Sequence, residues 1–255
     1  MRDLFTMWAN TRMIVLMALT AALYAAVLIP FKGFVIIPQL TEVRPAAAIP
    51  VVCGMLFGPA ACWGSALGNL IADVVGGMFG PGSLFGFLAN FMYAYVPYKL
   101  GEALRLDESG ASAGRRIGGY MLCCLSGSAA CALVAGWGVD LLGFVPFTFL
   151  SLVIFVNNSI ASLVLGPPLL AILQPRVKRW ELSYRDILEL ERRPSLAPAM
   201  VLVAATLGGF LVLNLTSLGF LQVTLLDPAA AKGVALIRNG GAGFLTLMII
   251  AMLLL

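Results

Sequence analysis

The sequence predicts an all-α integral membrane protein with about eight membrane-spanning helices. Hydrophobic residues make up 61% of the 255 residues and charged residues only 11%, whereas a soluble domain carries roughly 25% charge. The mean hydropathy is +0.99. A chain so poor in charge cannot cover a water-facing surface, so most of its surface must face lipid.

Eight apolar runs account for the predicted helices, since a hydrocarbon core of about 30 Å needs roughly 20 helical residues. They are 12–29, 44–58, 59–76, 83–100, 117–138, 146–173, 198–217 and 235–255. The second and third runs are short and meet at Phe57-Gly58-Pro59, so we expect 44–76 to form a tight helical hairpin. The sixth run carries Pro167-Pro168, a break that neighbouring helices can accommodate.

The polar stretch 174–197 divides these helices into six and two. We therefore expect a six-helix membrane domain at 1–173, a cytoplasmic linker at 174–197, and a two-helix membrane hairpin at 198–255. Within the linker, Ser183 and Asp186 resemble a capping box. They predict a short helix that lies on the membrane surface or, alternatively, docks a partner.

The positions of lysine and arginine predict the orientation. If the N-terminus is cytoplasmic, only four of the sixteen basic residues fall outside, namely Lys32, Arg44, Lys232 and Arg238, and the other twelve fall inside. The alternation holds through all eight helices. We expect a multi-pass protein of the cell inner (plasma) membrane with a cytoplasmic N-terminus.

Polar side chains within membrane helices are costly and are therefore candidates for function. In the predicted topology they gather in the outer half of the first six helices. The candidate substrate-binding residues are Glu42, Arg44, Asn69, Asp73, Asn90, Tyr93, Asn157 and Asn158. A few polar groups in apolar walls are typical of a small-molecule site. Alternatively, Glu42 and Arg44 pair with each other, and the asparagines hydrogen-bond neighbouring helices.

Other features argue against catalysis. Histidine is absent, which removes the commonest general base and metal ligand. The five cysteines lie in apolar runs without metal-binding or redox spacing and are expected to pack as small apolar residues. We expect no enzyme, no cofactor, no metal and no nucleic-acid partner. The rival classes are a membrane-embedded enzyme acting on a lipid or isoprenoid, and a structural subunit of a larger membrane complex.

The first helix carries small residues at regular spacing. Ala18, Ala22 and Ala26 recur every four residues, and such spacing lets another helix approach closely. Internal packing is the alternative to docking of a separate membrane subunit.

Over about 12–173 the chain resembles the substrate-binding S component of energy-coupling factor (ECF) transporters. The resemblance rests on the alanine-spaced segment 18–26, on Thr41-Glu42-Val43-Arg44-Pro45, and on Gly54-Met55-Leu56-Phe57-Gly58-Pro59 leading to Gly68-Asn69-Leu70-Ile71-Ala72-Asp73. The hairpin is similar to that of the branch of queuosine-precursor transporters. The two helices at 198–255 depart from the family pattern.

The resemblance implies a six-helix vitamin-binding protein with an outward-facing site capped by loops. It also implies that the first-helix alanines meet a T-type transmembrane subunit and that two cytoplasmic ATPases supply energy. The sequence is thus interpreted as the substrate-capture subunit of an ATP-driven importer for a vitamin or similar small nutrient. The expected partners are that small molecule, the T-type subunit, the two ATPases and the lipid bilayer.

Overall fold

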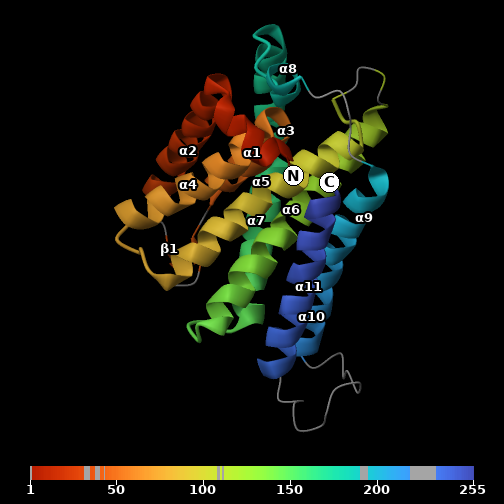
Figure 1. Ribbon diagram of the computed structural model, residues 1–255. Coiled ribbons are helices and arrows are strands. Elements are labelled where there is room, and N and C mark those ends of the chain that lie inside the picture. Colours follow the sequence, from red (N-terminus) through yellow and green to blue (C-terminus); the bar gives the residue numbers. More distant parts are fainter. Residues whose placement is uncertain are drawn as a thin grey trace.

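The computed structural model confirms an all-α membrane protein built from the predicted helices (Figure 1). The residues that it describes are 2–31, 35–37, 41–42, 44–107, 110, 112–189, 195–218 and 234–255. The helices are α1 Arg2–Thr6, α2 Thr11–Phe31, α3 Ala48–Phe57, α4 Pro59–Val75, α5 Pro81–Ala103, α6 Ala113–Leu141, α7 Phe147–Arg179, α8 Tyr184–Leu188, α9 Leu196–Val203, α10 Gly209–Ser217 and α11 Val234–Leu254.

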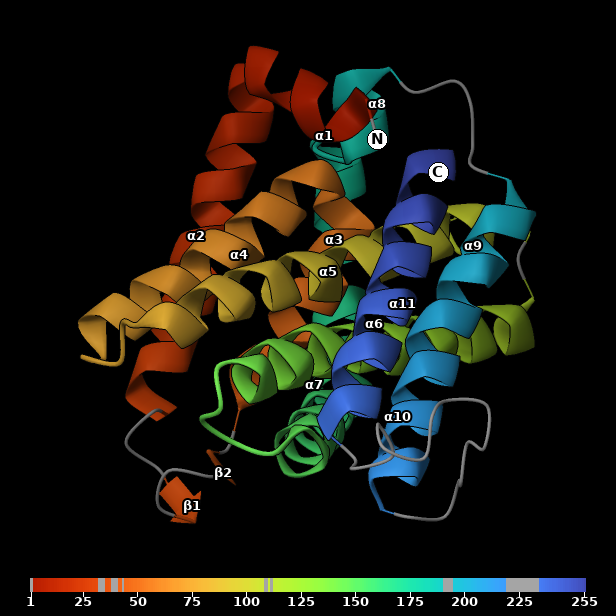
Figure 2. The same ribbon diagram turned by 60° about the horizontal axis from the view of Figure 1, so that its bottom comes forward.

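Short elements complete the described chain. The 3₁₀ turns Met7–Ala9 and Pro45–Ala47 precede α2 and α3, and a π-helical turn, Ala204–Gly208, joins α9 to α10. Two short strands, β1 Val35–Ile37 and β2 Thr41–Glu42, pair antiparallel. Figure 2 shows these strands at one end of the molecule, called here the outer end. Helices α1 and α8 lie at the opposite, inner end, together with both termini.

Five helical segments are long and apolar enough to cross a membrane by themselves. They are Thr11–Phe31, Ala113–Leu141, Phe147–Leu188, Leu196–Ser217 and Ile237–Leu254. Helices α3 and α4 have only 10 and 17 residues, because the chain reverses between them. All eight predicted helices form in the described part of the chain.

The turn at Gly58 makes the α3–α4 hairpin possible. Gly58 has φ +52°, in the region that favours glycine. A Cβ at this position would also lie 2.7 Å from the Tyr184 ring. A side chain at residue 58 is thus opposed both by the backbone and by the packing of α8.

Helix α4 lies close against α2 because small residues face the contact. A Cβ on Gly64 would lie 2.7 Å from the Met17 carbonyl oxygen, and one on Gly68 would lie 2.8 Å from that of Ala21. The two backbones therefore approach closely, as small residues allow between membrane helices.

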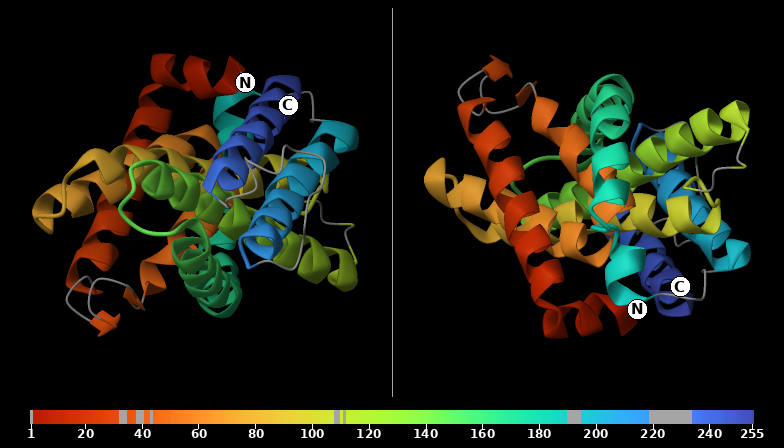
Figure 3. Two further views of the ribbon diagram at one scale, coloured as in Figure 1. Left: turned by 90° about the horizontal axis from the view of Figure 1, so that it is seen from below. Right: turned by 90° about the horizontal axis from the view of Figure 1, so that it is seen from above.

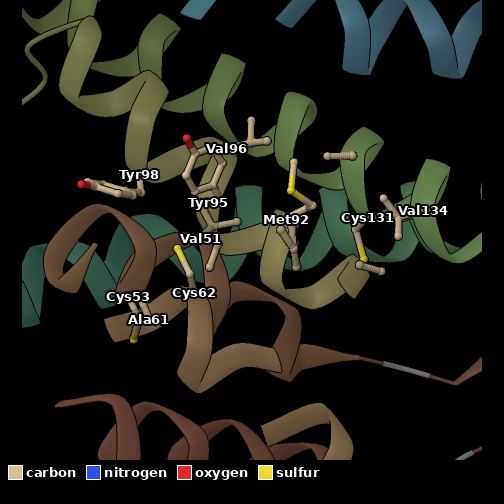
Figure 4. Packing of buried hydrophobic residues seen from close by; sticks show 14 of the residues in the cluster. Val51, Cys53, Ala61, Cys62, Met92, Tyr95, Val96, Tyr98, Cys131 and Val134 are labelled. Carbon is tan, nitrogen blue, oxygen red and sulfur yellow. The ribbon is translucent and has the colours of Figure 1, made fainter. Parts of the chain in front are cut away.

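The core of the bundle contains the cysteines that the sequence places in apolar runs. All five are buried and form no disulfide. Figure 4 shows Cys53, Cys62 and Cys131 among apolar neighbours such as Val51 and Met92. They pack there as small apolar residues.

The C-terminal hairpin, formed by Leu196–Ser217 and Val234–Leu254, packs along α5, α6 and α7. Ser151 Oγ donates to Asn214 Oδ1 at 3.0 Å, and Trp137 Nε1 donates to the Arg238 carbonyl at 3.0 Å. Tyr95 Oη donates to the Met252 carbonyl at 3.4 Å. Figure 3 shows from both ends that this hairpin and α2 lie on opposite sides of the molecule.

The region predicted as the linker 174–197 begins as helix. Helix α7 runs six residues past 173, through Pro175, and ends at Arg179. One proline removes a single backbone donor, and the last turn carries Arg176, Lys178 and Arg179, which favour a helix C-terminus. Ser183 then caps α8 by accepting from the Arg185 N–H at 3.4 Å.

Candidate functional site

Three candidate residues come together near the outer end. Asn69 and Asp73 lie one turn apart on α4, and Asn69 Nδ2 donates to Asp73 Oδ2 at 3.3 Å. Asn90 on α5 is buried and donates to the Gly86 carbonyl at 2.8 Å. A Cβ on Gly86 would lie 2.9 Å from Asn69 Nδ2, so this glycine leaves the space that brings α5 against Asn69.

Tyr24 on α2 joins this group, although it was not among the predicted residues. Its hydroxyl donates to Asn90 Oδ1 at 2.7 Å, and its side chain is almost fully buried. A tyrosine within an apolar helix needs a partner for its hydroxyl, and this signal was available in the sequence. We call Tyr24, Asn69, Asp73 and Asn90 the outer polar group.

Tyr93 and Asn158 meet deeper, between α5 and α7. The Tyr93 hydroxyl donates to the Asn158 carbonyl at 3.1 Å, and Ser162 Oγ donates to the same oxygen at 2.7 Å. Tyr93 is fully buried. Its hydroxyl therefore links two helices through a backbone oxygen.

Arg44 and Asn157 lie together at a small cavity. They line a cavity of about 250 Å³ between the 3₁₀ turn Pro45–Ala47 and α7, with apolar walls that include Ile160 and Val164. Ile160 and Val164 are 58% and 63% exposed, so this cavity opens on the lipid-facing side of α7. Asn157 and Arg44 thus share the wall of one cavity.

The charge of Arg44 also acts on groups outside its own cavity. The charge of Arg44 acts on both the Tyr24 hydroxyl and the Cys131 thiol, and the Asp73 carboxylate also acts on Tyr24. Cys131 is a second residue near the site that the sequence did not single out. The Glu42 side chain lies outside the described part, and only its backbone pairing with Val35 is seen.

The alanines of α2 lie on its outer surface. Ala18, Ala22 and Ala26 are exposed, whereas Ala21 and Ala25 are buried against the bundle. The four-residue spacing therefore places one row of small residues on a face that no described element covers.

A buried charge cluster joins α1, α5 and α8 at the inner end. Lys99 Nζ on α5 lies 2.7 Å from Asp3 Oδ2 of α1 and 3.8 Å from Glu102 Oε2. Glu102 Oε1 accepts from Arg185 of α8 at 2.7 Å. Because these carboxylates and Lys99 are buried, their mutual pairing offsets the cost of removing them from water.

Asp3 has a perturbed acidity in this cluster. Burial raises the pKa of its carboxyl, but attraction to Lys99 and hydrogen bonds from Lys99 and Tyr98 lower it. The effects that lower the pKa are together larger than the effect of burial, so the pKa of Asp3 falls from 3.8 to about 2. The carboxylate is thus stabilised in its charged form.

A cavity near the inner end, called here the inner cavity, is much larger than the cavity at Arg44. It measures about 1420 Å³ and is lined by parts of α3, α5, α6, α7 and α8. None of the predicted site residues lines it. The outer polar group therefore does not line this cavity.

These features define the class of the protein: a multi-pass, all-α membrane protein with a small polar group enclosed between its helices. The sequence model of the QueT transporter family matches residues 14–175, which span α2 to α7. The chain belongs to this family and is a membrane transport protein for a small substrate. Comparisons with curated proteins and with solved structures gave no match.

Proposed function

We propose that this chain is the substrate-capture subunit of an ECF-type, ATP-driven importer for a vitamin-like nutrient of the queuosine-precursor class. The observation that carries the proposal is the family match over 14–175, the same six helices that resemble an S component. The C-terminal hairpin is an addition to that unit. The chain has the N-terminus in the cytoplasm of the cell inner membrane in this proposal.

The outer polar group supplies the recognition chemistry in this proposal. Asp73 is half-buried and accepts from Asn69, and a carboxylate so placed accepts hydrogen bonds from amino or ring N–H groups. Asn90 offers both an amide donor and an acceptor. Arg44 either pairs with a negatively charged part of the ligand or orients neighbouring groups, and Asn157 completes its cavity.

The exposed alanine row supports a docking role for α2. Ala18, Ala22 and Ala26 are exposed on α2, and α2 lies on the side of the molecule opposite the C-terminal hairpin (Figure 3). A T-type subunit can therefore approach α2 without displacing the hairpin. Two cytoplasmic ATPases would then act through that subunit.

Co-purification tests the proposal in two steps. Mass spectrometry of the chain purified alone should identify a bound nutrient-sized molecule, and its equilibrium affinity should then be measured. Co-expression with a T-type subunit and two ATPases encoded beside its gene should give a stable complex that imports the same molecule only with ATP. Import by the chain alone, without ATP, would refute the capture-subunit assignment while leaving the transport role.

A further inference from the structure

The inner cavity is larger than a typical small-molecule site. Its volume of about 1420 Å³ exceeds the roughly 300–1,000 Å³ that is typical of small-molecule sites. It lies at the end of the bundle away from the outer polar group. Its size and position both indicate a different occupant from the transported molecule.

The deep part of the inner cavity is apolar and opens toward lipid. Met55 of α3 and Leu163 and Pro167 of α7 form its walls. Ile117 and Met121 of α6 also line it and are 63% and 46% exposed. Because these two residues lie on a membrane-spanning helix, an acyl chain of the surrounding bilayer can reach the cavity from the side.

The end of the same cavity nearest the water carries both signs of charge. Arg116 lies in the first turn of α6 and Lys178 in the last turn of α7, whereas Glu181 and Asp186 lie in the following segment and α8. Asp107 also lines this end, and its carbonyl accepts from Lys178 Nζ at 3.4 Å. Cationic and anionic side chains thus line the same cavity.

The fourth acid of the lining, Glu102, belongs to the buried charge cluster. Glu102 accepts from Arg185 at 2.7 Å and lies 3.8 Å from Lys99 Nζ. It therefore forms part of the buried wall. Charge recognition falls to the groups at the mouth.

We propose that the inner cavity binds a zwitterionic aminophospholipid, phosphatidylethanolamine, from the adjacent leaflet. An acyl chain lies along Met55 and Leu163. The phosphate lies beside Lys178 and Arg116, and the ammonium beside Glu181 and Asp186. Charge complementarity selects this headgroup, because cations and carboxylates at one mouth match a phosphate and an amine together.

Two other lipid classes fit this mouth less well. A choline headgroup lacks the N–H donors that the carboxylates can accept. An anionic lipid brings a net negative charge beside Asp107, Glu181 and Asp186 without a compensating amine. The proposal does not depend on which nutrient is transported.

Native mass spectrometry of the purified full-length chain tests the proposal. The protein is equilibrated in detergent with equal amounts of phosphatidylethanolamine, phosphatidylcholine and phosphatidylglycerol, and the bound lipid is counted. We expect the ethanolamine lipid to dominate. Lys178→Gln and Asp186→Asn should each lower its retention about fivefold or more, the size expected when one charge-assisted hydrogen bond is lost.

Cavity-filling variants test the acyl-chain position. Leu163→Trp and Met121→Trp should each abolish retention, because an indole would occupy the apolar depth. The matched controls are Arg179→Gln, an exposed base on the same helix end, and Ile172→Trp, an exposed residue of α7; neither position lines the cavity. Both controls should retain lipid as the wild type does.

Several results would overturn the proposal. Equal retention of the ethanolamine and choline lipids would show that the carboxylates do not select the headgroup. A preference for phosphatidylglycerol would show that the cavity binds an anionic lipid instead. Wild-type retention by both tryptophan variants would place the lipid elsewhere. Displacement of the lipid by the transported nutrient would make the cavity part of the transport path.

Discussion

The Tyr24 hydroxyl on α2 donates a 2.7 Å hydrogen bond to the Asn90 side-chain oxygen on α5. The bond joins the helix that bears the exposed alanines to the centre of the outer polar group. It therefore places the proposed recognition group and the proposed docking face on two sides of a single helix.

Removing the Tyr24 hydroxyl should destabilise the protein. Tyr24→Phe leaves Asn90 Oδ1, a buried acceptor, without this donor, and such a loss costs about 1–3 kcal/mol. The thermal midpoint should fall, and ligand affinity should change if Asn90 turns toward the site. The control is Tyr184→Phe, at the opposite end of the bundle, which should leave ligand affinity unchanged. A Tyr24→Phe protein as stable as the wild type would show that this bond contributes little.

Asp73→Asn and Asn157→Ala test the ligand site directly. If each residue contacts the ligand, affinity should fall by roughly 5- to 150-fold, which corresponds to about 1–3 kcal/mol. Thermal stability is measured separately, since a purely structural role would change stability without changing the affinity of folded protein. If both variants bind with wild-type affinity, the site is in the wrong place. A loss with Asp73→Asn alone would restrict the site to α2, α4 and α5.

Ala22→Leu should disrupt assembly and transport while ligand binding persists. Ala22 is exposed on α2, and an isobutyl group there would push a closely packed partner helix away. The matched control is Ala204→Leu, at an exposed alanine of the C-terminal hairpin, which should assemble normally. Assembly and import at wild-type levels by the Ala22→Leu protein would show that the partner docks elsewhere.

Acid should weaken the attachment of α1 through Asp3. The folded-state pKa of Asp3 is about 2, below its ordinary 3.8, so the contribution of this carboxylate is fully present above about pH 4. It is lost as pH falls toward 2. Unfolding measured across this range should show a shallower pH dependence for Asp3→Asn, whereas Glu189→Gln, at an exposed site, should follow the wild type. Identical profiles for the Asp3→Asn and wild-type proteins would contradict the assignment.

The orientation can be tested by cysteine labelling in intact cells. All five native cysteines are buried, so background labelling should be low. Ser183→Cys at the inner end should resist an impermeant reagent added outside, and Phe144→Cys, exposed in the α6–α7 turn, should react. Strong labelling of Ser183→Cys from outside would reverse the proposed topology.

The helices were predictable, but the direction that each one faces was not. Apolar length and the glycine–proline turn at Gly58 defined the eight predicted helices but not α1, and the spacing of Asn69 and Asp73 correctly placed them on one face. The cavity shared by Arg44 and Asn157 was not foreseen. A helix that is apolar all round has no amphipathic signal to set its rotation, so only packing decides where Asn157 points.

The inner cavity was also beyond prediction from sequence. Its lining combines segments far apart in the chain, from Met55 to Asp186. Tyr120, which lines it, donates to the Ser162 carbonyl at 2.7 Å and occupies the space over Gly166. No local sequence pattern predicts that these distant segments line one cavity.

The C-terminal hairpin limits where the chain can be truncated. The family match ends at residue 175, yet Tyr95, Trp137 and Ser151 donate to acceptors that lie beyond residue 195. A fragment that stops at the family boundary would turn these three donors toward hydrocarbon, where water cannot satisfy them. Minimal versions of this transporter for crystallisation or reconstitution should therefore keep the last two helices, or supply them as a separate chain.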